Sequence, residues 1–302
     1  MSKTIFLIHG RHFKPPKASL KRLWLEALRF GIERDHPDKL PAFDGARKEF
    51  IYYGDVSNKE LGSPGYDDTA ARRETLNELK KYEKKDFNKT TYERLPGKAA
   101  WKEGLADTFA GFLSTIRLSE RFVEAVAPDM RQYWNPDSRY GTEVRYPIIG
   151  PLKRAMRRGD EIMVISHSLG TMISYDTFWK FCRYGEYRPE FTDKKIDLWI
   201  TLGSPLADET VKRYLKGAGA SDYWRYPDNI VRWVNVAAED DYISHDGKVA
   251  DDYAAMKKLG LIESITDKRI YNLAVRNGKS NPHHGAGYLI DPDVAGVVAR
   301  WL

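Results

Sequence analysis

A serine stands where an apolar run meets a helical pattern, in the sequence Val164-Ile165-Ser166-His167-Ser168-Leu169-Gly170. A strand that turns directly into a helix strains its apex residue, and small residues two positions before and after let the neighbouring backbone approach. Ser166 and Gly170 occupy those positions around Ser168. The pattern predicts that Ser168 is a nucleophile and that the Leu169 amide, at the positive helix end, stabilises a developing oxyanion. A strand–helix junction that merely contains serines is the structural alternative.

This elbow resembles the nucleophile turn of the α/β-hydrolase superfamily, in particular of its lipase- and esterase-like members with a His-Ser-Leu-Gly elbow. Family members usually carry glycine where this chain has Ser166. A second stretch, Thr201-Leu202-Gly203-Ser204-Pro205, is similar to one found in lipase-like members, and we expect Ser204 to be structural or to lie at a pocket rim. The resemblance covers most of the chain outside a long insertion, and it implies an α/β-hydrolase fold with a trimmed sheet of about six strands.

In such hydrolases, a loop after an early strand supplies the second amide of the oxyanion hole. Here Phe6-Leu7-Ile8-His9-Gly10-Arg11 ends a strand in His-Gly, and the resemblance implies that the amide of Arg11 has this role. We expect His9 to be a structural histidine of the loop. His167 should point away from the site, because it neighbours the apex of the turn, so we expect it to pack in the interior.

The acid should follow the serine and precede the histidine in the chain. The expected strand Ile230–Val236 runs into Ala237-Ala238-Glu239-Asp240-Asp241-Tyr242, which resembles the strand-end acid of the family. Asp241 fits best, ahead of Asp240 and then Glu239. Its role would be to hold the histidine in one tautomer and to stabilise its charged form. Taken alone, the segment is equally consistent with a solvated acidic loop.

Two adjacent histidines, His283 and His284, precede Tyr288-Leu289 and a closing helical pattern. Their place resembles that of the family's terminal histidine, and a neutral imidazole there accepts the serine proton and later donates it to the leaving group. Neighbouring side chains should point in different directions, so one is the base, and the sequence does not separate them. His245 lies in the loop of the acid and fits the chain order less well.

Apolar runs rich in β-branched and aromatic residues alternate with helical patterns, which predicts a doubly wound, mostly parallel sheet covered on both faces. The expected strands are Thr4–Ile8, Glu49–Tyr53, Glu161–Ile165, Ile196–Leu202, Ile230–Val236 and Arg269–Val275. The expected helices outside the long connection are Ser19–Arg34, with Ser19 as its cap, Leu169–Cys182 and Asp293–Leu302.

About a hundred residues separate the second and third expected strands, far more than one crossover connection requires. Helical patterns cover Thr69–Lys85, Ala99–Ala127 and Glu143–Arg158, the last being the ordinary crossover helix. We therefore expect one α/β-hydrolase domain over residues 1–302, with a helical insertion at residues 56–142. Apolar residues of this insertion would line a pocket beneath a lid or fill a small core: Trp101, Phe109, Phe112, Leu113 and Phe122.

The chain has 302 residues with 49 basic and 43 acidic side chains, a net charge of +6. The basic residues are interspersed with acids and no nucleic-acid-binding motif accompanies them, so we expect no nucleic-acid partner. The apolar runs are too short to span a membrane, and the first residues lack a signal-peptide pattern. Cys182 is the single cysteine, so no intrachain disulfide forms and a cytoplasmic location is the default.

These patterns predict a serine hydrolase that cleaves a carboxylic ester, or a related acyl bond of a small molecule, through an acyl-enzyme intermediate. The sequence shows no convincing metal-ligand spacing and no glycine-rich phosphate loop, and we expect no cofactor. The alternative is a non-catalytic binding protein on the α/β-hydrolase fold, because a fold does not determine a function. The sequence does not reveal an oligomeric state.

Overall fold

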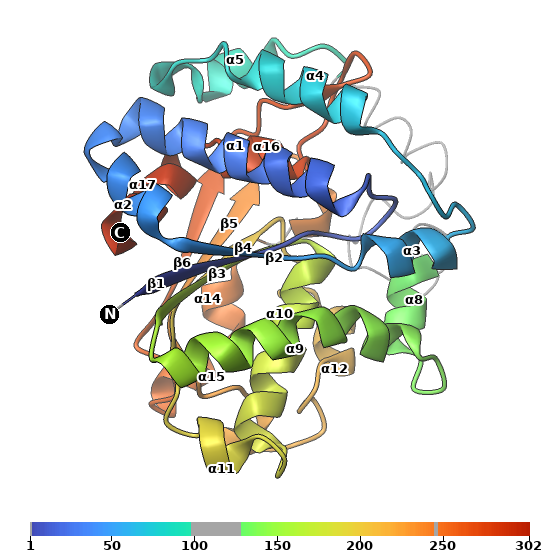
Figure 1. Ribbon diagram of the computed structural model, residues 1–302, viewed down its shortest axis with the longest axis vertical. Coiled ribbons are helices and arrows are strands. Elements are labelled where there is room, and N and C mark those ends of the chain that lie inside the picture. The colour runs from blue at the N-terminus through green and yellow to red at the C-terminus, as the bar shows by residue number, and fades with distance from the viewer. Residues whose placement is uncertain (1, 98–127, 245–246) are drawn as a thin grey trace.

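The computed structural model of the chain describes residues 2–97, 128–244 and 247–302. Within them, a central sheet of six strands has the order β2-β1-β3-β4-β5-β6, and every neighbouring pair is parallel (Figure 1). Its strands are β1 (Lys3–Ile8), β2 (Arg47–Ile51), β3 (Glu161–His167), β4 (Ile196–Leu202), β5 (Ile230–Ala238) and β6 (Ser264–Ile270). The predicted α/β class with about six parallel strands is confirmed.

Helices cover both faces of the sheet (Figure 1). One face carries α1 (Lys17–Asp35), α2 (Leu40–Gly45), α4 (Thr69–Leu79), α16 (Gly285–Leu289) and α17 (Pro292–Trp301). The opposite face carries α8 (Pro128–Trp134), α9 (Tyr140–Arg158), α10 (Leu169–Arg183), α11 (Arg188–Phe191), α12 (Glu209–Tyr214), α14 (Val249–Asp252) and α15 (Ala254–Lys258). The connections contain α3 (Gly54–Glu60), α5 (Lys89–Glu93), α13 (Asp222–Arg225), 3₁₀ turns at Pro37–Lys39, Lys84–Asp86 and Tyr242–Ser244, and the hairpin β7 (Val275–Arg276)–β8 (Lys279–Ser280).

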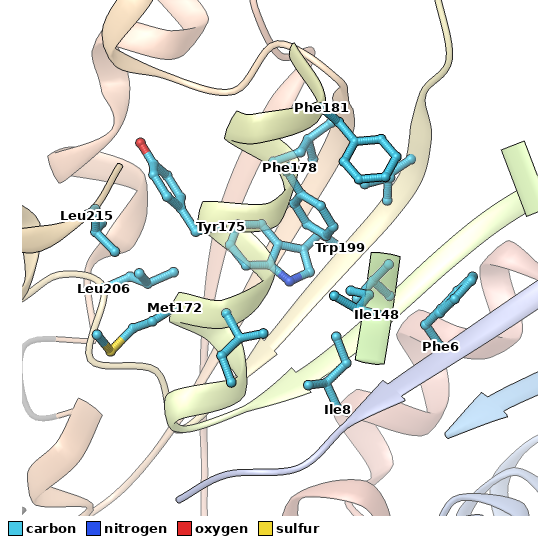
Figure 2. Close-up of a cluster of buried hydrophobic side chains, with 14 of the residues drawn as sticks. Phe6, Ile8, Ile148, Met172, Tyr175, Phe178, Phe181, Trp199, Leu206 and Leu215 are labelled. Atoms are coloured by element: carbon cyan, nitrogen blue, oxygen red, sulfur yellow. The ribbon is translucent and has the colours of Figure 1, made fainter. Parts of the chain in front are cut away.

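The central strands are buried on both sides, which explains why they appear as continuous apolar runs. In β1, Ile5 and Leu7 belong to the hydrophobic cluster under α1, whereas Phe6 and Ile8 belong to the cluster under α9 and α10 (Figure 2). In that second cluster, the indole of Trp199 packs edge to face against Phe178, with ring centroids 5.3 Å apart. This core on both faces holds the six parallel strands in place, so that their carboxyl ends lie together along one edge of the sheet.

Two predicted elements differ from the structure. The last strand of the central sheet is Ser264–Ile270, not Arg269–Val275, because β6 is an edge strand whose exposed side chains break the apolar run. The apolar residues that suggested the later position, Leu273 and Ala274, are buried in the connection after the strand. The helix α1 begins at Lys17 after Pro16, and no side chain caps it, so the prediction of Ser19 as its cap is wrong.

The predicted helical insertion is described in part. The helical pattern predicted at Thr69–Lys85 corresponds to α4 and the start of the 3₁₀ turn after it. The crossover pattern that follows the insertion, Glu143–Arg158, corresponds to α9. The whole middle pattern, Ala99–Ala127, lies outside the described residues. The apolar residues expected to line a pocket or fill a core belong to it: Trp101, Phe109, Phe112, Leu113 and Phe122. Leu76 and Leu79 of α4 are buried in the same cluster as α1, so α4 belongs to the helical layer over the sheet. No helix among the described residues is long and apolar enough to cross a membrane.

Candidate active site

The order of the sheet reverses between β1 and β3, because β2 lies on one side of β1 and the later strands extend on the other. In open α/β sheets, ligands bind beyond the carboxyl ends of the strands at such a reversal. The loop that begins at His9 leaves β1 at this edge, and Ser168 leaves β3 beside it. The topology alone therefore makes this edge the first candidate for a site.

Ser168 forms the sharp turn that its neighbours predicted. It connects β3 to α10 with a φ of 54° and a ψ of −127°, a conformation that residues with a side chain rarely adopt. A Cβ atom on Gly170 would lie 2.5 Å from the carbonyl oxygen of His9, and one on Gly10 would lie 2.7 Å from the Cβ of Ser168. Glycine is required at both positions because the loop after β1 packs directly against the turn.

Ser166, which stands where the family usually has glycine, has a hydrogen-bond partner in the core. Its hydroxyl accepts a hydrogen bond of 2.8 Å from the indole of Trp199, and that indole stacks on Trp233 with centroids 4.4 Å apart. The hydroxymethyl group is thus held by the aromatic cluster behind the sheet, and it is compatible with the tight turn.

An acid–base pair lies at the same edge. Nδ1 of His283 is 3.0 Å from Oδ1 and 2.9 Å from Oδ2 of Asp241. Asp241 is buried and also accepts hydrogen bonds from the hydroxyl of Tyr288, at 2.6 Å, and from the amide of Ile243, at 3.0 Å. Burial alone would raise the pKa of the Asp241 carboxyl, but the adjacent His283 and these hydrogen bonds outweigh burial and lower the pKa below its ordinary value.

The structure separates the three candidate acids. Asp240 has a φ of 59°, and its carboxylate accepts a hydrogen bond of 3.2 Å from Tyr92. Glu239 forms an ion pair with Arg269 at 2.8 Å. Only Asp241, of these three, has a hydrogen bond to a histidine among the described residues, so the acid with the best fit to the sequence pattern is also the one at the site.

The structure also separates the two histidines. The ring of His283 contacts Asp241, whereas His284 is buried and neither of its ring nitrogens has a hydrogen-bond partner among the described residues. Burial, together with the nearby charges of Arg72 and Arg276, lowers the pKa of His284 to about 3, so its imidazole is neutral at ordinary pH. Asn272 fixes the loop by donating to the carbonyl of His284, at 3.0 Å.

A cavity of about 430 Å³ joins the candidate residues, because both Ser168 and His283 line it. The hydroxyl of Ser168 is buried and makes no hydrogen bond to any described residue, so the serine and the histidine share a cavity without a direct bond in this structure. His167 also lines the cavity, and its Nε2 donates to the carbonyl of His283 at 2.9 Å. The expectation that His167 points away from the site is wrong.

The two residues expected to supply the oxyanion-hole amides lie near Ser168: Leu169 follows it in the chain, and Arg11 lines the same cavity. Leu169 is the first residue of α10, and amides in the first turn of a helix have no acceptor within the helix. Arg11 lies in the loop after β1, whose shape is held by the Lys14 ammonium donating to the carbonyls of Arg11, His12 and Phe13. Asn58 fixes the end of this loop by bonding both the amide and the carbonyl of Lys14.

The other singled-out residues are structural, as expected. His9 is buried and stacks on Tyr53 at 4.0 Å between centroids; it receives a hydrogen bond from the Tyr53 amide at 3.1 Å. Burial, helped by the charge of Lys14, lowers the pKa of His9 well below its ordinary value. Ser204 is buried and donates to the hydroxyl of Thr171 at 3.0 Å, which is a contact within the core.

The sequence patterns did not assign a role at the site to two further residues, Tyr288 and Gly203. The hydroxyl of Tyr288 donates a hydrogen bond to Asp241. The sequence signal that could have indicated this role is a tyrosine shortly after the candidate histidines, because a buried tyrosine hydroxyl usually has a hydrogen-bond partner. Gly203 has a φ of 54°, and a Cβ there would lie 2.9 Å from Oδ2 of Asp241 and 3.0 Å from Nδ1 of His283. The absence of a side chain at Gly203 therefore leaves room for the acid–base pair.

Scans against protein-family models, curated proteins and solved structures found no match for this chain. The described residues contain no group of three or more histidine, cysteine, aspartate or glutamate side chains placed to hold a metal ion. A functional assignment therefore rests on the geometry and chemistry of the site itself.

Proposed function

We propose that the chain is a serine hydrolase of the α/β-hydrolase type that cleaves carboxylic esters of small molecules, with Ser168 as nucleophile, His283 as general base and Asp241 as the acid that orients it. The observation that carries the proposal is the contact of the Asp241 carboxylate with Nδ1 of His283. His283 lines the same cavity as Ser168, which lies in a strained strand–helix turn. Serine, acid and histidine follow β3, β5 and β6 in the chain order of that superfamily.

The contact with Asp241 sets the tautomer of His283. A carboxylate with a lowered pKa only accepts hydrogen bonds, so Nδ1 of His283 carries the proton and Nε2 keeps its lone pair. Nε2 takes the proton of Ser168 as the serine oxygen attacks the carbonyl carbon, and the imidazolium then donates this proton to the departing alkoxide. Water attacks the acyl-enzyme by the same steps and releases the acid and the free serine.

The amides of Leu169 and Arg11 would stabilise the oxyanion of both tetrahedral intermediates. Ser168 and His283 have no direct bond in this structure, and catalytic hydrogen bonds in ligand-free proteins often shorten only when substrate is bound. The mechanism requires the Ser168 hydroxyl to come within hydrogen-bond distance of Nε2 of His283.

The test is labelling of the folded protein with a fluorophosphonate probe, combined with hydrolysis of p-nitrophenyl butyrate. We expect the label on Ser168, and we expect Ser168→Ala to lower the rate by about a thousandfold or more, because the attacking atom is removed. Folded protein without label on Ser168 would count against the proposal. Equal rates for the wild type and Ser168→Ala would instead support a non-catalytic binding protein.

The two histidines provide a matched pair of variants. His283→Gln should lower the rate on the same ester by about a thousandfold, because Gln cannot act as the base. His284→Gln should have a much smaller effect, since the ring of His284 does not contact Asp241. Similar losses in both variants would contradict the assignment of the base to His283.

A further inference from the structure

The described lining of the active-site cavity is strongly basic. It contains Arg11, Lys14, Arg72 and Arg276 but no acidic side chain. A second cavity of about 640 Å³ shares Arg72 and Arg276 with the first, so the two adjoin at these arginines. A ligand at Ser168 therefore lies in a space whose described walls carry excess positive charge.

Arg72 and Arg276 share a single counter-ion. Nε of Arg72 is 2.8 Å from Oδ1 of Asp68, and Nη2 of Arg276 donates to Oδ2 of the same carboxylate. Burial would raise the pKa of Asp68, but the two guanidinium groups lower it, so the carboxylate stays ionised. One negative charge faces two positive ones, and the group of three keeps a net charge of +1.

Two side chains of the cavity wall, Arg276 and His284, have buried nitrogen atoms without hydrogen-bond partners among the described residues. Nε of Arg276 is buried and has no hydrogen-bond partner among the described residues. Both ring nitrogens of His284, which is 6% exposed and lines the cavity, are also without a partner. Buried polar groups are nearly always hydrogen-bonded in folded proteins, so unpaired donors beside a cavity indicate a ligand with acceptor atoms.

We propose that the ester substrate carries an anionic group, a carboxylate or a phosphate, which binds at Arg72 and Arg276 while the ester carbonyl lies at Ser168. The inference rests on the proposed hydrolase function and names its substrate class. Guanidinium groups match the planar geometry of such oxyanions and form charge-assisted hydrogen bonds with them. The neutral imidazole of His284 supplies one further N–H donor beside them.

The kinetic test compares charged and neutral esters of the same shape. An anionic acyl part is provided by mono-p-nitrophenyl glutarate, with its methyl ester as the neutral partner; an anionic leaving group is provided by meta-acetoxybenzoate, with its methyl ester as partner. The ratio of kcat/KM for the charged over the neutral ester should exceed one in at least one pair. Arg276→Gln should lower that ratio by about tenfold, and Arg276→Lys by less, because a charge-assisted hydrogen bond is lost.

Arg157→Gln is the matched control, because Arg157 is an exposed arginine of α9 paired with Glu190 and lines neither cavity. Its charged-to-neutral ratio should equal that of the wild type. A wild-type preference for the neutral ester in both pairs, or an equal ratio in the wild type and Arg276→Gln, would overturn the proposed anion site.

A binding measurement separates this inference from the proposed hydrolase function. Glutarate or inorganic phosphate should raise the melting temperature of Ser168→Ala and should not raise that of Ser168→Ala/Arg276→Gln. Stabilisation by one of these anions alone identifies a carboxylate or a phosphate as the preferred group. If an anion stabilises the protein but no ester is cleaved, the anion site stands and the hydrolase assignment fails; if neither anion stabilises it, the anion site is rejected.

Discussion

Tyr288 donates a hydrogen bond of 2.6 Å to Oδ2 of Asp241, the carboxylate oxygen that also lies 2.9 Å from Nδ1 of His283. The same hydroxyl accepts a hydrogen bond of 2.9 Å from the amide of Ala238 at the end of β5. Burial and the charge of Asp241 raise the pKa of Tyr288 well above its ordinary value, so it remains a donor. One buried phenol thus joins the end of a strand to the acid.

Tyr288→Phe tests this relationship. The variant removes a donor from Asp241 and leaves the Ala238 amide without an acceptor, which should cost about 1–3 kcal/mol of unfolding free energy. We expect kcat on an ester to fall by about tenfold with little change in KM, because the acid–histidine geometry loosens. Tyr253→Phe is the control, since its buried hydroxyl donates to the carbonyl of Leu206 at 3.0 Å. It should lose stability and keep kcat; equal losses of kcat would show a general effect of weakened packing.

Backbone strain at Ser168 can be measured with two substitutions that both remove the hydroxyl. The φ of 54° and ψ of −127° are unfavourable for alanine and accessible to glycine. Ser168→Gly should therefore be more stable than Ser168→Ala by about 1 kcal/mol, after allowing for the greater flexibility of unfolded glycine. Urea unfolding of both variants measures the difference. An alanine variant as stable as the glycine variant would mean that the turn is not strained.

Gly203 and Gly260 form another matched pair. Both have a positive φ, 54° and 68°, so alanine should cost each about 1–2 kcal/mol of stability. Only at Gly203 does the added Cβ meet the acid–base pair, while at Gly260 it meets nothing within 4 Å. Gly203→Ala should consequently lower ester hydrolysis by about tenfold or more, and Gly260→Ala should not. If Gly203→Ala keeps its full rate at saturating substrate, the Asp241–His283 contact is not required.

The buried His284 makes stability depend on pH. Its pKa is about 3 in the folded protein and 6.5 when unperturbed, so the unfolded chain binds a proton between these values and the folded chain does not. Stability therefore falls as the pH decreases from 6.5 towards 3. In His284→Gln the slope should be smaller by up to about 1.4 kcal/mol per pH unit. Urea unfolding at several pH values checks this, and parallel stability curves for both proteins would contradict it.

The central part of the fold and the nucleophile turn could be predicted because their signals are local. Buried parallel strands are continuous apolar runs, and the turn needs small residues at fixed spacing around Ser168. The edge strand β6 was misplaced because one exposed side removes the apolar run. The sequence pattern ranked Asp241 first among the three candidate acids, but it did not separate His283 from His284 as the base. Backbone dihedrals, such as the φ of 59° at Asp240, decide which of two neighbouring side chains faces inward, and a sequence pattern does not contain them.

Contacts between distant segments could not be predicted from one sequence. Arg276 and Asp68 are 208 residues apart in the chain and meet only because β7 packs beside α4. The Tyr288–Asp241 bond likewise depends on α16 lying against the end of β5. No spacing rule connects such pairs, so the basic character of the cavity emerges from the tertiary structure alone.

The position of β1 has a consequence for how the protein is made. This strand lies inside the sheet between β2 and β3, and Lys3 is opposite Glu161 of β3. During translation it has only β2 to pair with until β3, which begins more than a hundred residues after the end of β2, has left the ribosome. Closing so long a loop is slow, and the apolar strand stays uncovered meanwhile. The nascent chain is therefore a natural client for chaperones that shield exposed strands.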